Sequence, residues 1–170
     1  MSLGGSMQSS DRTKIYTLNT DTTNRKAGSA EDTYEVFRRK YPAEGYLKAQ
    51  VYAGQQGFPI PSVQVEVSKQ FARGMYVFDT QVTDVSGLTQ PVALPTSPAA
   101  LSQNPGQMQP YATYDIRLSH PDYTEVIVRN VGIFEGVVAL QPMEMLPKGA
   151  APGGRRIMEY NVRQAPLPQE

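Results

Sequence analysis

From Gly45 onward, apolar and polar residues alternate with a period of two, and turns that contain Gly or Pro interrupt the alternation. In YLKAQVYA, for example, Leu47, Ala49 and Val51 fall on one side of an extended chain and the intervening residues on the other. Such alternation is typical of strands in an antiparallel sheet with one buried face. Seven such stretches occur, at 46–53, 62–69, 75–83, 91–94, 111–119, 124–131 and 137–146.

This spacing predicts an all-β fold, a seven-stranded antiparallel β-sandwich that spans residues 45–147. The residues expected in its core are Val63, Val65, Tyr114, Ile116 and Leu118. In the stretch at 75–83, the same alternation places Tyr76, Phe78, Thr80 and Val82 on one face.

The segment before the sandwich, residues 1–44, is predicted to be an arm with one short helix over 30–40. Ser29 is the expected N-cap, acidic residues follow in the first turn, and Pro42 stops the helix. Three aromatic residues, spaced three and four apart, make a narrow stripe on this helix: Tyr34, Phe37 and Tyr41.

The segment after the sandwich, residues 148–170, begins with a Gly-rich hinge and continues with RRIMEYNV, which can pair as a strand. KIYTLNT in the first arm has the same capacity. Ordering a residue costs about 1–2 kcal/mol of backbone entropy, and neither arm has enough apolar surface to offset that cost alone. We therefore expect the arms to contact other subunits rather than their own sandwich, with Ile157 and Tyr160 as candidate contacts in the second arm.

The composition excludes several functions. Sixteen basic residues balance sixteen acidic ones, so no net charge attracts nucleic acid. Cysteine is absent and His120 is the single histidine, which is too few ligands for a typical zinc site. No apolar run reaches the ~18 residues of a membrane span, and the N-terminus does not resemble a signal peptide. We expect no metal, no cofactor and no membrane insertion in a protein made in the cytoplasm.

The stretch TDVSG, residues 83–87, is a turn rather than a catalytic motif. Asp84 can accept hydrogen bonds from backbone N–H groups two residues on, and Gly87 can adopt a positive φ. A catalytic Ser86 would need a base beside it, but His120 lies in a different turn.

Three stretches carry a resemblance to a known family: VALP, PYATYD and IFEGVVALQPMEMLP. Over about residues 45–147 the chain resembles the transthyretin-like, carboxypeptidase-regulatory-like β-sandwich at the N-terminus of spore cortex-lytic enzymes and of related peptidoglycan-binding proteins. In those enzymes the lytic domain follows the sandwich, whereas this chain ends soon after it. The resemblance therefore implies the fold and the setting of a spore, but no lytic activity.

Two hypotheses of function follow. The first is a non-enzymatic structural subunit that its arms link to neighbours, as a homo-oligomer or filament, in a spore, envelope or phage-like particle. The alternative is a monomeric module that binds peptidoglycan or another glycan through exposed tyrosines and the Pro-rich loop at 95–109. The tyrosines of this hypothesis are Tyr46 and Tyr52, on the outward face of the first strand, and Tyr111, which follows the Pro-rich loop.

Overall fold

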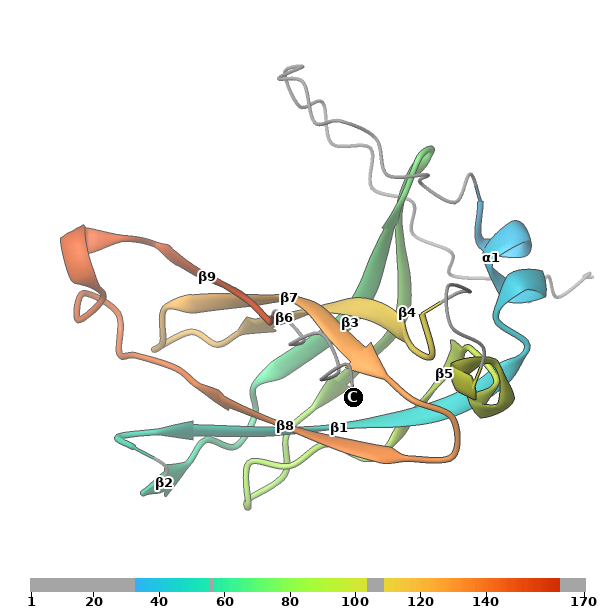
Figure 1. Cartoon of the computed structure of the whole chain (residues 1–170). Helices are drawn as coiled ribbons and strands as arrows, with labels where there is room; N and C mark the ends of the chain where they lie inside the picture. The colour runs from blue at the N-terminus through green and yellow to red at the C-terminus, as the bar shows by residue number, and fades with distance from the viewer. Residues whose placement is uncertain (1–32, 56, 104–108, 163–170) are drawn as a thin grey trace, which may run out of the picture.

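The computed structural model describes residues 33–55, 57–103 and 109–162, and it consists mainly of two β-sheets that lie face to face (Figure 1). Its elements are α1 (Tyr34–Lys40), β1 (Ala43–Ala53), β2 (Phe58–Pro59), β3 (Gln64–Phe71), β4 (Gly74–Val82), β5 (Val92–Thr96), η1 (Ala99–Gln103), β6 (Ala112–Ser119), β7 (Glu125–Ile133), β8 (Val138–Glu144), η2 (Pro152–Gly154) and β9 (Ile157–Asn161).

In the smaller sheet, β1 is central: β8 pairs with it in parallel on one side, and β5 and β2 pair antiparallel. The larger sheet has the order β4-β3-β6-β7-β9, and its last pair, β7 with β9, is also parallel. The prediction of a β-sandwich is thus confirmed. The prediction of seven antiparallel strands is wrong, because the described residues form nine strands in two mixed sheets. Alternation reports which face of a strand is buried, but it does not report the direction of the neighbouring strand.

The core lies between the sheets, and the five residues predicted to form it are buried. Val63, Val65, Tyr114, Ile116 and Leu118 have exposed fractions of 0–3%. On β1 the predicted inward face is also correct, since Leu47, Ala49 and Val51 are buried.

The predicted face of β4 is correct in its first half, where Tyr76 and Phe78 pack against the core, and wrong in its second half. A bulge between the pairs Val67–Asp79 and Ser68–Val77 leaves Phe78 without a partner on β3. The extra residue reverses the alternation, so that Asp79 and Gln81, rather than Thr80 and Val82, lie on the inner side. Val82 consequently points outward and is 61% exposed.

The turn interpretation of TDVSG is confirmed. Asp84 Oδ1 accepts hydrogen bonds from the N–H groups of Ser86 (2.8 Å) and Leu88 (3.0 Å). Gly87 has φ +70°, and a Cβ atom there would lie 2.3 Å from the carbonyl oxygen of Val51. The turn therefore requires glycine for its φ angle and for its close approach to β1.

Helix α1 begins later than predicted. Thr33 is the N-cap: its side chain accepts a hydrogen bond from the N–H of Val36. Its own backbone is extended (φ −147°, ψ 165°), so no helix runs through it from residue 30. The expected cap, Ser29, lies outside the described residues.

The helix packs on the chain's own sandwich, which corrects the expectation of contacts with other subunits for the described part of this arm, residues 33–44. Phe37 is fully buried, with ring centroids 5.5 Å from Phe71 and 6.1 Å from Tyr114. Tyr41 lies against Phe37. The larger sheet presents an aromatic pocket at this end, and the helix stripe fills it.

The second arm also joins its own sandwich. Strand β9 pairs with β7, and Met158 packs against the core. The predicted hinge before it is a hydrogen-bonded connection, in which Lys148 N–H donates to the carbonyl of Asp122 (3.0 Å) and Ala151 is buried. Strand β9 pairs in parallel with the open edge of β7 and makes main-chain hydrogen bonds there. The sequence had led us to expect such bonds with a neighbouring subunit. KIYTLNT lies outside the described residues.

Candidate functional site: an apolar sheet face

The outer face of the smaller sheet has a row of apolar side chains along β8, its edge strand, and Lys48 and Gln50 of β1 lie beside this row. Because Leu47, Ala49 and Val51 point into the core, the residues between them on β1 point outward. The parallel register places Val138 beside Tyr46 and Leu140 beside Lys48. The side chains of Val138 and Leu140 are 54% and 53% exposed. We refer to this surface as the β1–β8 face and define it by Tyr46, Tyr52, Val138, Leu140 and Pro142.

Pro142 shows how β8 lies against β1. The N–H of Tyr46 donates to the carbonyl of Val137, and the N–H of Met145 donates to the carbonyl of Tyr52, both at 2.9 Å. Odd-numbered residues of β8 therefore bond to β1, and even-numbered residues present their backbone groups to the open edge. Pro142 occupies an even position, where its missing N–H removes no hydrogen bond from the sheet. It also interrupts the row of donors that an added strand would need.

The outer face of the larger sheet carries arginine and carboxylate side chains that form ion pairs. Arg117 Nε lies 2.6 Å from Glu125 Oε1, and this hydrogen bond raises the pKa of the Arg117 guanidinium. Arg129 bridges two carboxylates, Asp115 at 2.7 Å and Glu159 at 2.8 Å. Burial lowers the pKa of Arg129, but its hydrogen bonds to Glu159 and Asp115 outweigh burial and raise the pKa overall. The two outer faces of the sandwich thus differ: ion pairs are concentrated on the larger sheet, whose exposed Val82 and Ile157 lie apart on different strands, whereas three successive outward positions of β8 on the smaller sheet are apolar.

Tyr46 has a defined orientation at one end of the β1–β8 face. Its hydroxyl donates to Glu44 Oε1 at 2.8 Å. The hydrogen bond to Glu44, and the negative charge of that carboxylate, raise the pKa of the phenol. The ring therefore remains neutral and offers an apolar surface at neutral pH.

The candidate residues from the sequence separate into four places. Tyr46 and Tyr52 lie on the β1–β8 face, whereas Tyr34, Phe37 and Tyr41 belong to the aromatic contacts that hold α1. Tyr111 packs on Phe134, with ring centroids 5.3 Å apart. Ile157 and Tyr160 lie on β9 and are 45% and 46% exposed. Phe37 has no exposed surface for a partner.

Val138 and Leu140 were not predicted from the sequence. The signal was present, because VVAL has apolar residues at consecutive positions. One face of such a stretch belongs to the core, and the other face must then be apolar as well.

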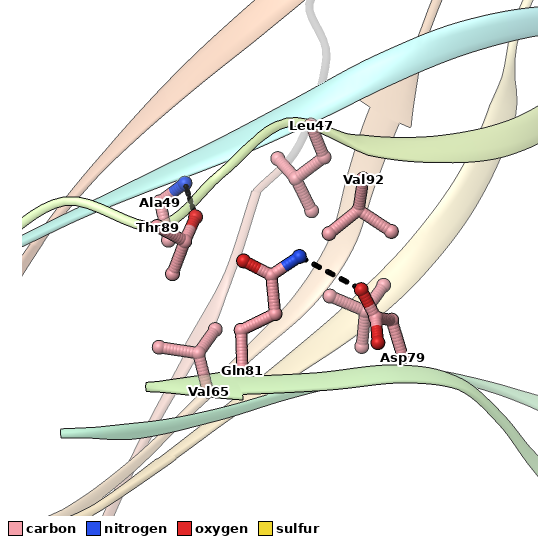
Figure 2. A pocket seen from close by; sticks show the side chains of 8 residues that line it. Leu47, Ala49, Val65, Asp79, Gln81, Thr89 and Val92 are labelled. Carbon is pink, nitrogen blue, oxygen red and sulfur yellow. Dashed lines mark hydrogen bonds between the residues drawn. The ribbon is translucent and has the colours of Figure 1, made fainter. Parts of the chain in front are cut away.

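Two polar side chains of β4, Asp79 and Gln81, lie between the sheets. Figure 2 shows Gln81 pointing toward Leu47 and Val92, with its amide nitrogen hydrogen-bonded to Asp79 at 2.8 Å. Gln81 Oε1 accepts from the N–H of Gln90 at 2.9 Å. The space among these side chains does not admit a water molecule, so it is not a ligand site. An inward carboxylate and a bulge both protect an edge strand against pairing with another chain.

The described residues contain no group of three His, Cys, Asp or Glu side chains placed to hold a metal ion. His120 lies in the predicted turn, where its Nδ1 accepts from the N–H of Asp122 at 3.1 Å. Among the helices of the described part, none is long and apolar enough to cross a membrane.

No protein-family model matches the chain, and no curated protein matches its sequence. Among solved structures, the chain is similar to one from a type II cohesin–X-dockerin complex of Acetivibrio cellulolyticus. The two are 14% identical, with a TM-score of 0.37, over 65% of this chain and 63% of that chain. Similarity at this level does not place the chain in a family.

Proposed function

We propose that this protein is a non-enzymatic assembly subunit and that its β1–β8 face binds a second copy of the chain. The observation that carries the proposal is the difference between the two outer faces. The larger sheet has paired charges outside, whereas Val138 and Leu140 are half exposed on β8, the edge strand of the smaller sheet. Contiguous exposed apolar surface on a soluble domain marks an interaction site.

The open edges are less suitable for assembly than this face. Strand β4 has a bulge and an inward carboxylate, β8 contains Pro142, and β9 spans only Ile157–Asn161. Strand addition needs a longer uninterrupted row of donors and acceptors. The described parts of both arms are already bound to their own sandwich, so the proposal assigns assembly to a face rather than to the arms.

A second copy is the occupant that the charges favour. The net charge is zero, so copies do not repel one another through a shared excess of one sign. The face also contains charges of both signs: Lys48 lies beside Leu140, and Glu144 lies beside Tyr52. A surface with both signs can be self-complementary in a two-fold arrangement.

The setting follows from the family resemblance alone. On that basis we place the assembly in a spore, envelope or phage-like particle. The alternative, a glycan-binding module that uses Tyr46 and Tyr52, would occupy the same face with a different partner, and the two proposals predict different oligomeric states.

Sedimentation velocity of the full chain over a wide concentration range tests the proposal. We expect species larger than the monomer. We expect Leu140→Lys to shift the distribution to monomer, because it places a charge in the apolar row of β8. Val82→Lys is the matched control: Val82 is also exposed on a strand, but on the other sheet. A wild-type chain that is monomeric at every concentration would refute the proposal.

A further inference from the structure

A groove of about 420 Å³ lies at one end of the larger sheet, away from the β1–β8 face. Its floor comes from neighbouring strands: Gln64 on β3 pairs with Ser119 on β6, and Glu125 begins β7. Its walls come from three connections, namely the turn at Ser62, the turn from His120 to Tyr123, and the segment before β9 with Lys148 and Arg156. Its volume falls in the range of about 300–1,000 Å³ that is usual for small-molecule sites.

The groove is rich in hydrogen-bond donors. His120 Nδ1 accepts from the N–H of Asp122, so the proton of the neutral ring lies on Nε2, which is then a donor. Three residues that carry hydroxyl groups, Ser62, Ser119 and Tyr123, also line the groove. No described residue makes an ion pair with Lys148 or Arg156.

Among the residues that the structure describes, Glu125 is the one acidic residue that lines the groove, and Arg117 balances its negative charge. Glu125 Oε1 lies 2.6 Å from Nε of Arg117, and Arg117 is not among the groove residues. The charge that remains for a ligand is therefore positive, from Lys148 and Arg156. This donor set matches an anion and does not match a metal cation, which needs free carboxylate or imidazole ligands.

Ser62 provides an independent observation. It follows Pro61 in a turn and has φ +60°, a conformation that glycine adopts without strain and serine does not. Its N–H donates to the carbonyl of Thr83 at 3.0 Å, which fixes the turn. A strained serine where glycine would be more stable is typical of a residue retained for its side chain.

The geometry points to a binding site for an oxyanion, a carboxylate or phosphate group of a small ligand, held by Lys148 and Arg156 with the hydroxyl and imidazole donors around it. The site lies on the sheet opposite to the proposed assembly face, so either proposal can fail while the other stands.

Isothermal titration calorimetry of the full chain tests the site with sodium glucuronate, inorganic phosphate and, as an uncharged control, glucose. We expect one or both anions to bind and glucose not to bind. Binding of glucuronate alone identifies a carboxylate site, and binding of phosphate alone identifies a phosphate site. The proposal is overturned if glucose binds as tightly as glucuronate, or if neither anion binds at millimolar concentration.

Variants separate a built site from general charge attraction. Lys148→Gln and Arg156→Gln should each weaken binding about five- to tenfold. Arg155→Gln, a neighbouring exposed arginine that does not line the groove, should leave binding unchanged. Ser62→Gly should weaken binding and raise the melting temperature, whereas a purely structural serine would change stability alone. If Arg155→Gln weakens binding as much as Arg156→Gln, the site proposal is wrong.

Discussion

The rings of Tyr34 and Tyr76 stack face to face, with centroids 4.4 Å apart and planes inclined by 3°. This contact joins helix α1 to strand β4, and the buried ring of Phe37 lies beside it, 6.3 Å from Phe78. A segment that the sequence assigns to an arm is thus part of the packed core. Helix α1 and the sandwich are therefore expected to unfold together.

Phe37→Ala tests whether helix α1 and the sandwich unfold together. Removing a fully buried phenylalanine leaves a cavity, and we expect a loss of about 3–5 kcal/mol in the free energy of unfolding, measured by urea denaturation. Val36→Ala is the control on the same helix, since Val36 is 41% exposed and should change stability by less than about 0.5 kcal/mol. Equal effects of the two substitutions would show that the helix does not pack as described.

Gly87→Ala measures how closely the Asp84–Gly87 turn approaches β1. A new Cβ would lie 2.3 Å from the carbonyl oxygen of Val51, in addition to the strain of φ +70°. Gly136→Ala has the same φ strain (φ +68°) but no atom within 4 Å of its Cβ. That strain alone costs of order 1–3 kcal/mol. Thermal unfolding should show a clearly greater loss for Gly87→Ala, and equal losses would contradict the contact with Val51.

Glu44→Gln should lower the pKa of Tyr46 toward its ordinary value. The hydrogen bond and the negative charge of Glu44 both favour the neutral phenol, so the phenol loses its proton at a higher pH than an isolated tyrosine. NMR titration of ring-labelled tyrosine measures the change directly. Glu135→Gln removes a carboxylate that accepts instead from the N–H of Ala99, and it should leave the Tyr46 titration where it is.

A chain that ends at Gly154 lacks β9 and tests whether the second arm belongs to its own sandwich. Without its parallel neighbour, β7 becomes an edge strand, and the Arg129 side chain loses its bond to Glu159. Hydrogen exchange should be faster in β7 than in β3, which keeps both neighbours. Unchanged protection of β7 would show that β9 does not pair with it in solution.

Local alternation predicted the inward residues of β1, of β6 and of β3 as far as Val67, because these stretches alternate without interruption. It failed on the second half of β4, because the bulge at Phe78 depends on pairing with β3 and has no local signal. On β7 the buried positions change from Val126 and Val128 to Val131 and Ile133, because Asn130 adopts φ +61° in a second bulge. Asparagine tolerates that conformation, so this bulge had a sequence signal that was missed.

The candidate face was half predicted. Tyr46 and Tyr52 followed from the alternation on β1, but their neighbours followed only from the parallel register with β8, a contact between residues about 90 positions apart in sequence. Contacts with other subunits were predicted for the arms because apolar residues can pack on any complementary surface, but the described parts of both arms pack on their own sandwich. The sequence alone did not reveal that the same chain provides such a surface.

Site-specific cross-linking tests the central claim, that copies meet through the β1–β8 face. The chain has no cysteine, so Leu140→Cys introduces a single thiol at the centre of the face. Under mild oxidation we expect this variant to form disulfide-linked dimers at concentrations where Val82→Cys, exposed on the other sheet, remains largely monomeric. Equal cross-linking of the two variants, or none for Leu140→Cys while the protein is assembled, would contradict the account.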